Sequence, residues 1–305
     1  MREPLTSGSL SSAYLWCPAY PLPHATAVGE AQSAAAAFTT ALQLELVDSP
    51  LLTRHPGPGA WLTAAERRAD LPHDSAWLIA ARGGYGCVDL LEQWATWSAA
   101  NPTTRIIGYS DLTLLHAAQA ALGRPGGLYG FMPGVRHGPR ALSSAIALAR
   151  GETLEVDGLP GVQALHRGTA EGPLFAGCLR VLTSLCGTPW MPRLRNCILA
   201  LEDIDERPYR VDRDLHQLHA SGALEGLAGL LFGGFPSELP AAYAGPSTAA
   251  ICTAWAARLG VPALFGLPFG HDPDPLTLGL GRLTTFSAHD GWTLTQSSTP
   301  CAFHR

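Results

Sequence analysis

The 305-residue chain contains no lysine, so the 20 residues counted as lysine plus arginine are all arginine. Without lysine the chain has no residue to form a Schiff base, to act as base beside a serine, or to hold a nucleotide phosphate in a P-loop. Any catalytic base must therefore be a histidine or a carboxylate. Charged residues make up only 15% of the chain and hydrophobic residues 47%, which is the composition of a compact globular protein.

Other absences narrow the class of protein. The seven cysteines are an odd number without a C-x-x-C pair, which favours reduced thiols over a disulfide framework. The formal net charge is −5 and no basic run occurs, so neither nucleic acid nor a membrane surface is an expected partner. No apolar stretch reaches the roughly 18 residues of a transmembrane helix, and no signal peptide is evident. We therefore expect a cytoplasmic protein, and whether it forms a homodimer stays open.

Short apolar runs alternate with helical patterns along most of the chain, which is typical of α/β structure with parallel sheets. The length favours two domains, predicted over residues 1–150 and 173–305, with residues 151–172 as a linker of short Gly- and Pro-containing strands. The strands predicted in the first half are 14–17, 44–47, 76–81 and 105–109, and the helices are 28–42, 63–70, 88–100, 112–122 and 140–150. In the second half we predict helices 179–185, 211–220 and 248–259, strands 198–201 and 227–232, and a β-rich tail over 276–294.

One serine lies at a tight bend between a predicted strand and helix, in Arg105-Ile-Ile-Gly-Tyr-Ser110-Asp-Leu-Thr. A serine hydroxyl on a tight turn, followed by backbone N–H donors, is typical of a nucleophile elbow. The segment lacks the usual G-x-S-x-G pattern of that elbow. Ser110 or Asp111 could instead cap the helix, because both residue types are preferred N-caps. The segment alone leaves both interpretations open.

A glycine-rich loop, Ala81-Arg-Gly-Gly-Tyr-Gly86, also joins a strand to a helix. Its glycines let the backbone approach a bound group closely, so its amides could face an oxyanion or a substrate carboxylate. It is not the dinucleotide-binding pattern G-x-G-x-x-G, and a plain tight turn would have the same composition. Cys87, directly after the loop, is a minor alternative nucleophile.

A carboxylate and a histidine complete a candidate catalytic set. Glu202 ends the apolar strand Leu199-Ala-Leu-Glu202-Asp203, and His271 follows a glycine in Pro268-Phe-Gly-His271-Asp. Together with Ser110 they supply a nucleophile, a base and a carboxylate to orient the base. We predict that these three residues lie close together in the folded chain.

Other histidines have simpler interpretations. His216 and His219 are three residues apart on one predicted helix face, but no further ligand completes a zinc set, so we expect no metal site. Arg136-His137-Gly-Pro139 has the pattern of an entry into a helix, with proline suited to the first helical position. Trp94 and Trp97 are predicted to pack in the core.

Four segments occur in series over about residues 76–281. They are Arg82-Gly-Gly-Tyr-Gly; Gly108-Tyr-Ser-Asp-Leu-Thr; Gly187-Thr-Pro-Trp-Met-Pro with Leu201-Glu-Asp-Ile-Asp-Glu-Arg-Pro-Tyr-Arg-Val-Asp-Arg; and Pro268-Phe-Gly-His-Asp-Pro. In this combination the chain resembles the LD-carboxypeptidases, serine peptidases that remove the terminal D-alanine from bacterial cell-wall tetrapeptides, and their relatives that confer microcin immunity. Two departures are that Tyr129-Gly-Phe-Met stands where the family has His-Gly-Pro, and Gly279 where proline is usual.

The resemblance implies a triad of Ser110, His271 and Glu202, with the nucleophile on the N-terminal domain and its two partners on the C-terminal one. It also implies that the oxyanion donors are backbone amides of the Gly83-Gly84 loop and of Asp111. We accordingly expect an α/β fold, with an N-terminal flavodoxin-like parallel-sheet domain and a C-terminal α/β domain that has a β-rich end.

The expected reaction is hydrolysis of the bond between an L-configured centre and a terminal D-alanine in murein tetrapeptides, during cell-wall recycling and without a cofactor. Arg82 is the first candidate to bind the free carboxylate of this muropeptide substrate, because arginine binds carboxylates bidentately, and a structural ion pair is its alternative role. Three other functions stay open. They are a microcin-immunity-like peptidase acting on a nucleotide-linked peptide, a catalytically silent muropeptide-binding module, and an α/β-hydrolase esterase, which the missing G-x-S-x-G disfavours.

Overall fold

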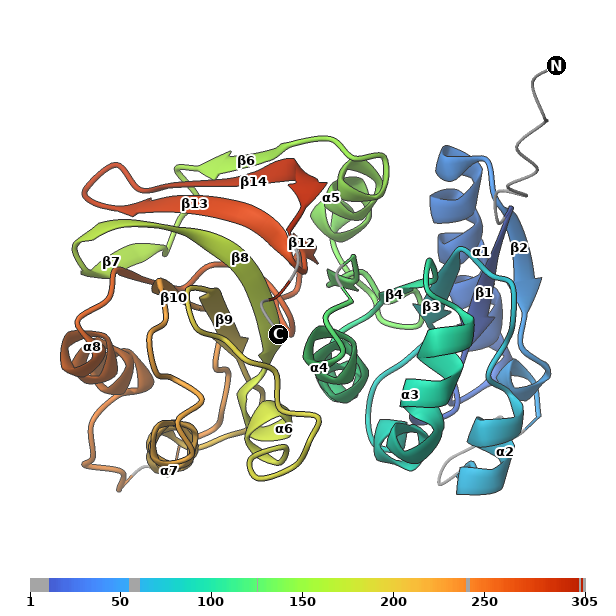
Figure 1. Ribbon diagram of the computed structural model, residues 1–305, viewed down its shortest axis with the longest axis horizontal. Coiled ribbons are helices and arrows are strands. Elements are labelled where there is room, and N and C mark those ends of the chain that lie inside the picture. The colour runs from blue at the N-terminus through green and yellow to red at the C-terminus, as the bar shows by residue number, and fades with distance from the viewer. Residues whose placement is uncertain (1–10, 55–60, 125, 240–241, 302, 304–305) are drawn as a thin grey trace, which may run out of the picture.

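Two β-sheets with helices packed against them form the framework of the chain (Figure 1). The computed structural model describes residues 11–54, 61–124, 126–239, 242–301 and 303. Helices and strands alternate through both halves, so the predicted α/β class is confirmed. No helix in these ranges is long and apolar enough to cross a membrane.

The first sheet has the strand order β12-β5-β4-β3-β1-β2, in which β1 to β5 are parallel. This 2-1-3-4-5 order is the flavodoxin-like order that the sequence predicted. Its strands are β1 (Ser12–Trp16), β2 (Glu45–Asp48), β3 (Trp77–Ala80), β4 (Arg105–Ile107), β5 (Leu128–Tyr129) and the antiparallel β12 (Leu278–Gly279). Its helices are α1 (Ala25–Leu42), α2 (Ala64–Ala69), α3 (Leu91–Ala100), α4 (Thr113–Ala121) and α5 (Pro139–Ala149), with single turns η1 (Pro50–Leu52), η2 (Cys87–Leu90) and η3 (Ser110–Leu112).

Both faces of this sheet are buried, because side chains of its central strands point alternately to opposite sides. Trp77 and Ile79 of β3 face the core that contains α1 and α5, whereas Leu78 and Ala80 face the core that contains α3 and α4. The near-continuous apolar runs that predicted these strands follow from this two-sided burial. The predicted core tryptophans of α3 are buried and stacked, with ring centroids 4.7 Å apart.

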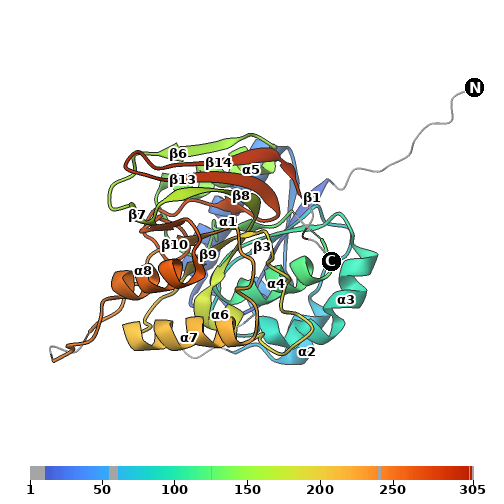
Figure 2. The same ribbon diagram turned by 60° about the vertical axis from the view of Figure 1, so that its left-hand side comes forward.

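The second sheet has the order β6-β14-β13-β8-β9-β10-β11-β7, with β8 to β11 parallel and the outer strands antiparallel. Its strands are β6 (Leu154–Asp157), β7 (Gln163–His166), β8 (Gly168–Cys178), β9 (Ile198–Glu202), β10 (Gly229–Phe232), β11 (Ala263–Phe265), β13 (Arg282–Ala288) and β14 (Thr293–Pro300). Its helices are α6 (Leu179–Thr183), α7 (Pro208–Ala220) and α8 (Thr248–Leu259). Figure 2 shows α6 between α7 and the first half's α4.

The segment expected as a linker, residues 151–172, contains β6, β7 and the first part of β8, all of which pair within the second sheet. This segment lacks a continuous apolar run because β6 and β7 lie at the two edges of that sheet and are half exposed. The domain limits at 150 and 173 stay a prediction. The other predicted helices and strands agree with the structure to within about three residues at their ends, whereas the β-rich tail extends six residues beyond 294, to Pro300. The short strands β5 and β11 were not predicted.

The two halves share contacts at several places. The strand β12 comes from the C-terminal part of the chain but pairs with β5 of the first sheet. Thr277, just before it, receives a hydrogen bond from the Phe131 amide and donates one to the Ala141 carbonyl. Gln296 of β14 holds β12 from the other side, since its side-chain amide bonds both the N–H and the C=O of Gly279 at 2.9 and 3.1 Å.

Replacement of Gln296 by leucine is predicted to destabilise the fold. Gln296 is fully buried, so the variant leaves the N–H and C=O of Gly279 without these partners and lowers the free energy of unfolding by about 3 kcal/mol. Urea denaturation of Gln296→Leu measures the change. The exposed Thr293→Val on the same strand is the control, and equal stability of both variants would contradict this role of Gln296.

Candidate active site

The strand ends that the sequence analysis singled out meet where the two sheets adjoin. The Gly loop, residues 82–86, follows β3, and Ser110 follows β4, so both leave the first sheet at its carboxyl edge. Glu202 is the last residue of β9 in the second sheet, and His271 lies in the connection after β11. Carboxyl ends of strands are where open α/β sheets place their ligands.

Ser110 occupies a strained bend. Its φ is +65°, a left-handed conformation that non-glycine residues rarely adopt, and Gly108 two residues earlier has φ +149°. The alternative role as a helix cap is wrong, because Tyr109 occupies the N-cap position of η3 and no side chain caps this turn. A Cβ placed on Gly83 would lie 3.1 Å from Ser110 Oγ, so the hydroxyl lies directly against the Gly loop.

The Gly loop presents unused backbone donors beside this hydroxyl. Among the described residues, neither the Gly83 amide nor the Gly84 amide donates a hydrogen bond. The Gly83 carbonyl accepts one from the Tyr20 amide at 3.3 Å, which fixes the loop against the segment after β1. Gly84 has φ +118°, and a Cβ there would fall 2.3 Å from the Tyr20 ring, so glycine is required at this position.

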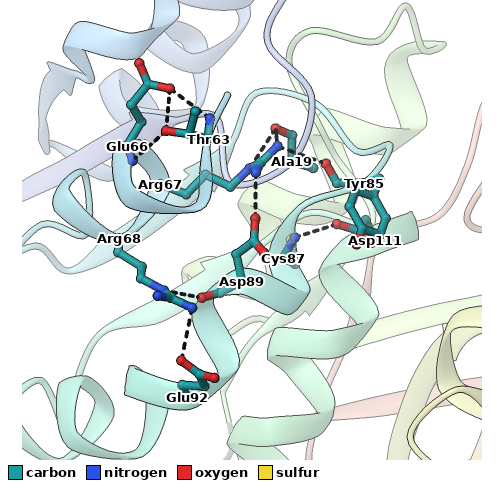
Figure 3. Close-up of polar contacts among 10 residues, drawn as sticks. All are labelled: Ala19, Thr63, Glu66, Arg67, Arg68, Tyr85, Cys87, Asp89, Glu92 and Asp111. Atoms are coloured by element: carbon teal, nitrogen blue, oxygen red, sulfur yellow. Dashed lines mark hydrogen bonds and ion pairs between the residues drawn. The ribbon is translucent and has the colours of Figure 1, made fainter. Parts of the chain in front are cut away.

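Arg67 of α2 holds the same loop through its guanidinium (Figure 3). Its side chain is fully buried, and its guanidinium donates to the carbonyls of Ala19 and Tyr85 at 3.3 Å and pairs with Asp89 at 2.7 Å. A Cβ on Gly86 would lie 2.3 Å from Arg67 Nε, so the loop lies directly on the guanidinium. A buried arginine with these acceptors ties together the segment after β1, the Gly loop and η2.

Asp111 joins the Gly loop to the serine turn through its side chain. Its carboxylate accepts a hydrogen bond from the Cys87 amide at 2.8 Å (Figure 3). Burial, followed by the nearby Asp111 charge, raises the pKa of the Cys87 thiol well above its ordinary value. The thiol is inaccessible and disfavoured as a thiolate, which argues against Cys87 as the nucleophile.

Glu202 and His271 form a hydrogen-bonded pair. His271 Nδ1 lies 2.7 Å from Glu202 Oε2, and the same oxygen accepts from the His271 amide at 3.2 Å. The Glu202 side chain is fully buried, while 15% of the His271 side chain is exposed. Burial alone lowers the pKa of His271, but the hydrogen bond and charge of Glu202 outweigh it, so this pKa lies above its usual value.

Tyr129, at the end of β5, is a contact that sequence reasoning missed. Its hydroxyl donates to Glu202 Oε1 at 2.6 Å and accepts from the Ser110 amide at 3.4 Å. The only sequence signal was that Tyr129 begins the stretch where the family has His-Gly-Pro.

Asp203 follows Glu202 and fixes the end of β9. Burial raises the pKa of Asp203 to about 6, and its carboxylate accepts a hydrogen bond from the Arg180 amide at 2.8 Å.

The serine and the histidine are brought near one another but are not bonded. Tyr109, the neighbour of Ser110, lies edge-on to the His271 ring with centroids 4.9 Å apart. Within the described part of the chain, Ser110 Oγ makes no hydrogen bond, and neither does His271 Nε2. In an enzyme without substrate such a contact is often long and tightens only in the complex.

Arg82 and the remaining histidines have other contacts. Arg82 donates to the Pro21 carbonyl at 3.4 Å, and its guanidinium lies 6.0 Å from the Tyr20 ring, at the edge of the Gly loop. His137 packs beside Tyr109, with ring centroids 5.6 Å apart. The helical pair His216 and His219 packs against the ring of Trp255. In the ranges that the structure describes, no group of three or more His, Cys, Asp or Glu side chains could hold a metal ion.

The chain matches two models of one protein family. Residues 15–130 match the LD-carboxypeptidase N-terminal domain, and residues 171–286 match the LD-carboxypeptidase C-terminal domain. A Synechocystis sp. protein provisionally named a carboxypeptidase is 36% identical over 232 residues, which cover 68% of this chain and 70% of that protein. The murein tetrapeptide carboxypeptidase of Pseudomonas aeruginosa is 33% identical over 224 residues, covering 66% of this chain and 69% of its own.

A solved structure shows the same fold. The crystal structure of muramoyltetrapeptide carboxypeptidase from Oxalobacter formigenes superposes with a TM-score of 0.80 at 26% identity, and the match covers 95% of this chain and 99% of that one. The two-sheet arrangement described above is therefore shared over nearly the whole length of both proteins.

The adjacent residues Arg67 and Arg68 of α2 allow a matched test of the contacts that Arg67 makes with the Gly loop. Arg67→Met leaves Asp89 and two carbonyls without their buried partner, so we expect the free energy of unfolding to fall by about 3 kcal/mol. Arg68→Met removes contacts to the Asp89 carbonyl and Glu92 that lie at the surface, so its expected effect is below about 0.5 kcal/mol. Chemical denaturation of both variants measures the difference, and equal losses would contradict this role of Arg67.

Proposed function

The chain belongs to the LD-carboxypeptidase family of serine-type peptidases, and on that premise we propose that it removes the terminal D-alanine from murein tetrapeptides. Relatives named for murein peptides support this substrate class. The reaction suits the recycling of wall fragments in the cytoplasm. Nothing in the described geometry favours a nucleotide-linked substrate or a silent binding module.

The observation that carries the proposal is the hydrogen-bonded pair of buried Glu202 and partly buried His271 beside the strained Ser110 turn. A carboxylate can only accept hydrogen bonds, so its contact with Nδ1 requires the proton on that nitrogen when the ring is neutral. The lone pair then lies on Nε2, the nitrogen that a nucleophile's base must use. In this proposal His271 is the base, and Glu202 fixes its tautomer and stabilises the imidazolium.

In the first half of the reaction, Ser110 Oγ attacks the carbonyl carbon of the scissile bond as His271 Nε2 takes its proton. The carbonyl oxygen becomes an oxyanion, which the free amides of Gly83 and Gly84, together with the amide of Asp111, are proposed to stabilise. The C–N bond then breaks as His271 returns the proton to the departing amine of D-alanine. The shortened peptide stays on Ser110 as an ester.

Water completes the cycle. His271 takes a proton from a water molecule, which attacks the ester carbonyl, and gives it to Ser110 Oγ as the C–O bond breaks. A carboxypeptidase must also recognise the terminal carboxylate of its substrate. We keep Arg82 as the candidate, because only one of its nitrogens has a hydrogen-bond partner among the described residues, and that bond is long at 3.4 Å.

Replacement of Ser110 tests the reaction. Ser110→Ala should abolish release of D-alanine from a murein tetrapeptide, with a loss of about 10⁴-fold or more, and should prevent labelling by a fluorophosphonate. Ser143→Ala, at an exposed site on α5, is the control. Labelling of Ser110→Ala at the parent rate would disprove the nucleophile. A parent protein that binds the tetrapeptide without releasing D-alanine would instead be a binding module.

Gly83→Ala tests the oxyanion site. The added methyl group would lie about 3 Å from the hydroxyl oxygen of Ser110, in the space where the oxyanion is proposed to form, so kcat should fall by about 10²–10³-fold. Gly29→Ala on α1, where a Cβ meets nothing within 4 Å, is the matched control. Release of D-alanine at the parent rate by Gly83→Ala would exclude this loop from the reaction.

A further inference from the structure

Tyr129 is held in one place by packing from both halves of the chain. It is the last residue of β5, it is fully buried, and β5 lies next to β4, the strand that leads to Ser110. Its ring packs edge-on against Tyr109 of the first half and Phe269 of the second, with centroids 6.2 and 6.4 Å away. The hydroxyl therefore has little freedom to move.

That hydroxyl connects two members of the proposed triad. A carboxylate only accepts and an amide only donates, so the hydroxyl must donate its one proton to Glu202 and accept from Ser110 N–H. Burial, and next the charge of Glu202, raise the pKa of Tyr129 well above its usual value, so the phenol keeps this proton.

The Glu202 carboxylate depends on this donor. Within the described ranges it accepts three hydrogen bonds, two on Oε2 from His271 and one on Oε1 from Tyr129. Without Tyr129, Oε1 would have no partner among the described residues, in a side chain that has no exposure to solvent. A buried carboxylate oxygen without a donor is costly, and proton uptake by the His271–Glu202 pair relieves that cost.

We propose that Tyr129 is a positioning residue, which holds Glu202 as an anion against His271 and ties it to the Ser110 turn. The inference rests on the proposed function for its catalytic consequence, but the coupling between the three side chains does not depend on it. By partly neutralising Glu202, the phenol limits how strongly the pair attracts a proton. His271 is thereby kept available as a neutral base near pH 7.

Tyr129→Phe removes this one hydroxyl and keeps the ring. The pair then binds its proton more tightly, so the pKa of His271 should rise by about one unit, which histidine NMR of the folded protein measures. The histidine signal is assigned from the spectrum of His271→Asn. The other titratable groups around the pair, which the substitution leaves unchanged, are Tyr109, His137, Cys178, Asp203 and Asp205.

Tyr129→Phe should also lower the activity at neutral pH. A raised pKa leaves more His271 protonated at pH 7, so kcat of Tyr129→Phe should fall about tenfold, with KM within about twofold. The deficit should shrink as the pH rises by one to two units, because the base is then neutral in both proteins. A loss that arises only from disturbed packing would not recover with pH.

The chain offers a matched control in Tyr14 of β1. Its hydroxyl donates to the carboxylate of Asp70 at 2.7 Å, the same chemistry on a different strand. Tyr14→Phe should leave the pKa of His271 and kcat unchanged. An unchanged or lowered pKa of His271 in Tyr129→Phe overturns the proposal.

Two further measurements cover other outcomes. If Tyr129→Phe does not fold, 3-fluorotyrosine at position 129 makes a stronger donor and should lower the pKa of His271, and no shift or an upward shift overturns the proposal. If the parent protein releases no D-alanine, the proposed function fails, whereas the NMR titration still decides whether Tyr129 controls the pair.

Discussion

The buried carboxylate of Glu202 is the group on which the arrangement of this site depends. An anion without solvent must be surrounded by donors, and its donors come from both halves of the chain, Tyr129 from the first sheet and His271 from the segment after β11. Each donor is held in turn by aromatic packing around Tyr109. The Glu202 carboxylate therefore links the two halves of the chain at the point where the two sheets meet.

A second set of contacts holds the turn that carries Ser110. Arg67 donates to the Tyr85 carbonyl of the Gly loop, and the Asp111 carboxylate, from the serine turn, accepts from the Cys87 amide directly after that loop (Figure 3). These contacts over-determine a bend that would otherwise relax, because Ser110 at φ +65° is strained by itself. The two sets meet at one bond, from the Ser110 amide to the Tyr129 hydroxyl. The geometry of the serine thus depends on residues distant in the sequence.

Local patterns predicted most of the framework. Buried parallel strands leave near-continuous apolar runs, and turns leave glycine and proline, so β1, β3, β4 and β9 were visible in the sequence. The edge strands β6 and β7 were interpreted as a linker because half-exposed strands with Gly and Pro between them carry a weak pattern. The strand β12 was visible only as part of a β-rich tail. That it crosses to β5 depends on a long-range hydrogen-bond pairing that no local pattern encodes.

The sequence by itself determined which residue types stand at the strand ends. With no lysine in the chain, any catalytic base had to be a histidine or a carboxylate, and Ser110, Glu202, His271 and the Gly loop all lie at strand ends or turns with a local signature. Only the tertiary structure decided that Glu202 bonds His271 and that Tyr129 and Arg67 support the site. A tyrosine in a strand and an arginine in a helix have no local sequence signature, because their roles depend on the residues that they contact in the folded chain. The Tyr129 hydroxyl meets a carboxylate 73 residues away, and burial of that charge makes the contact strong.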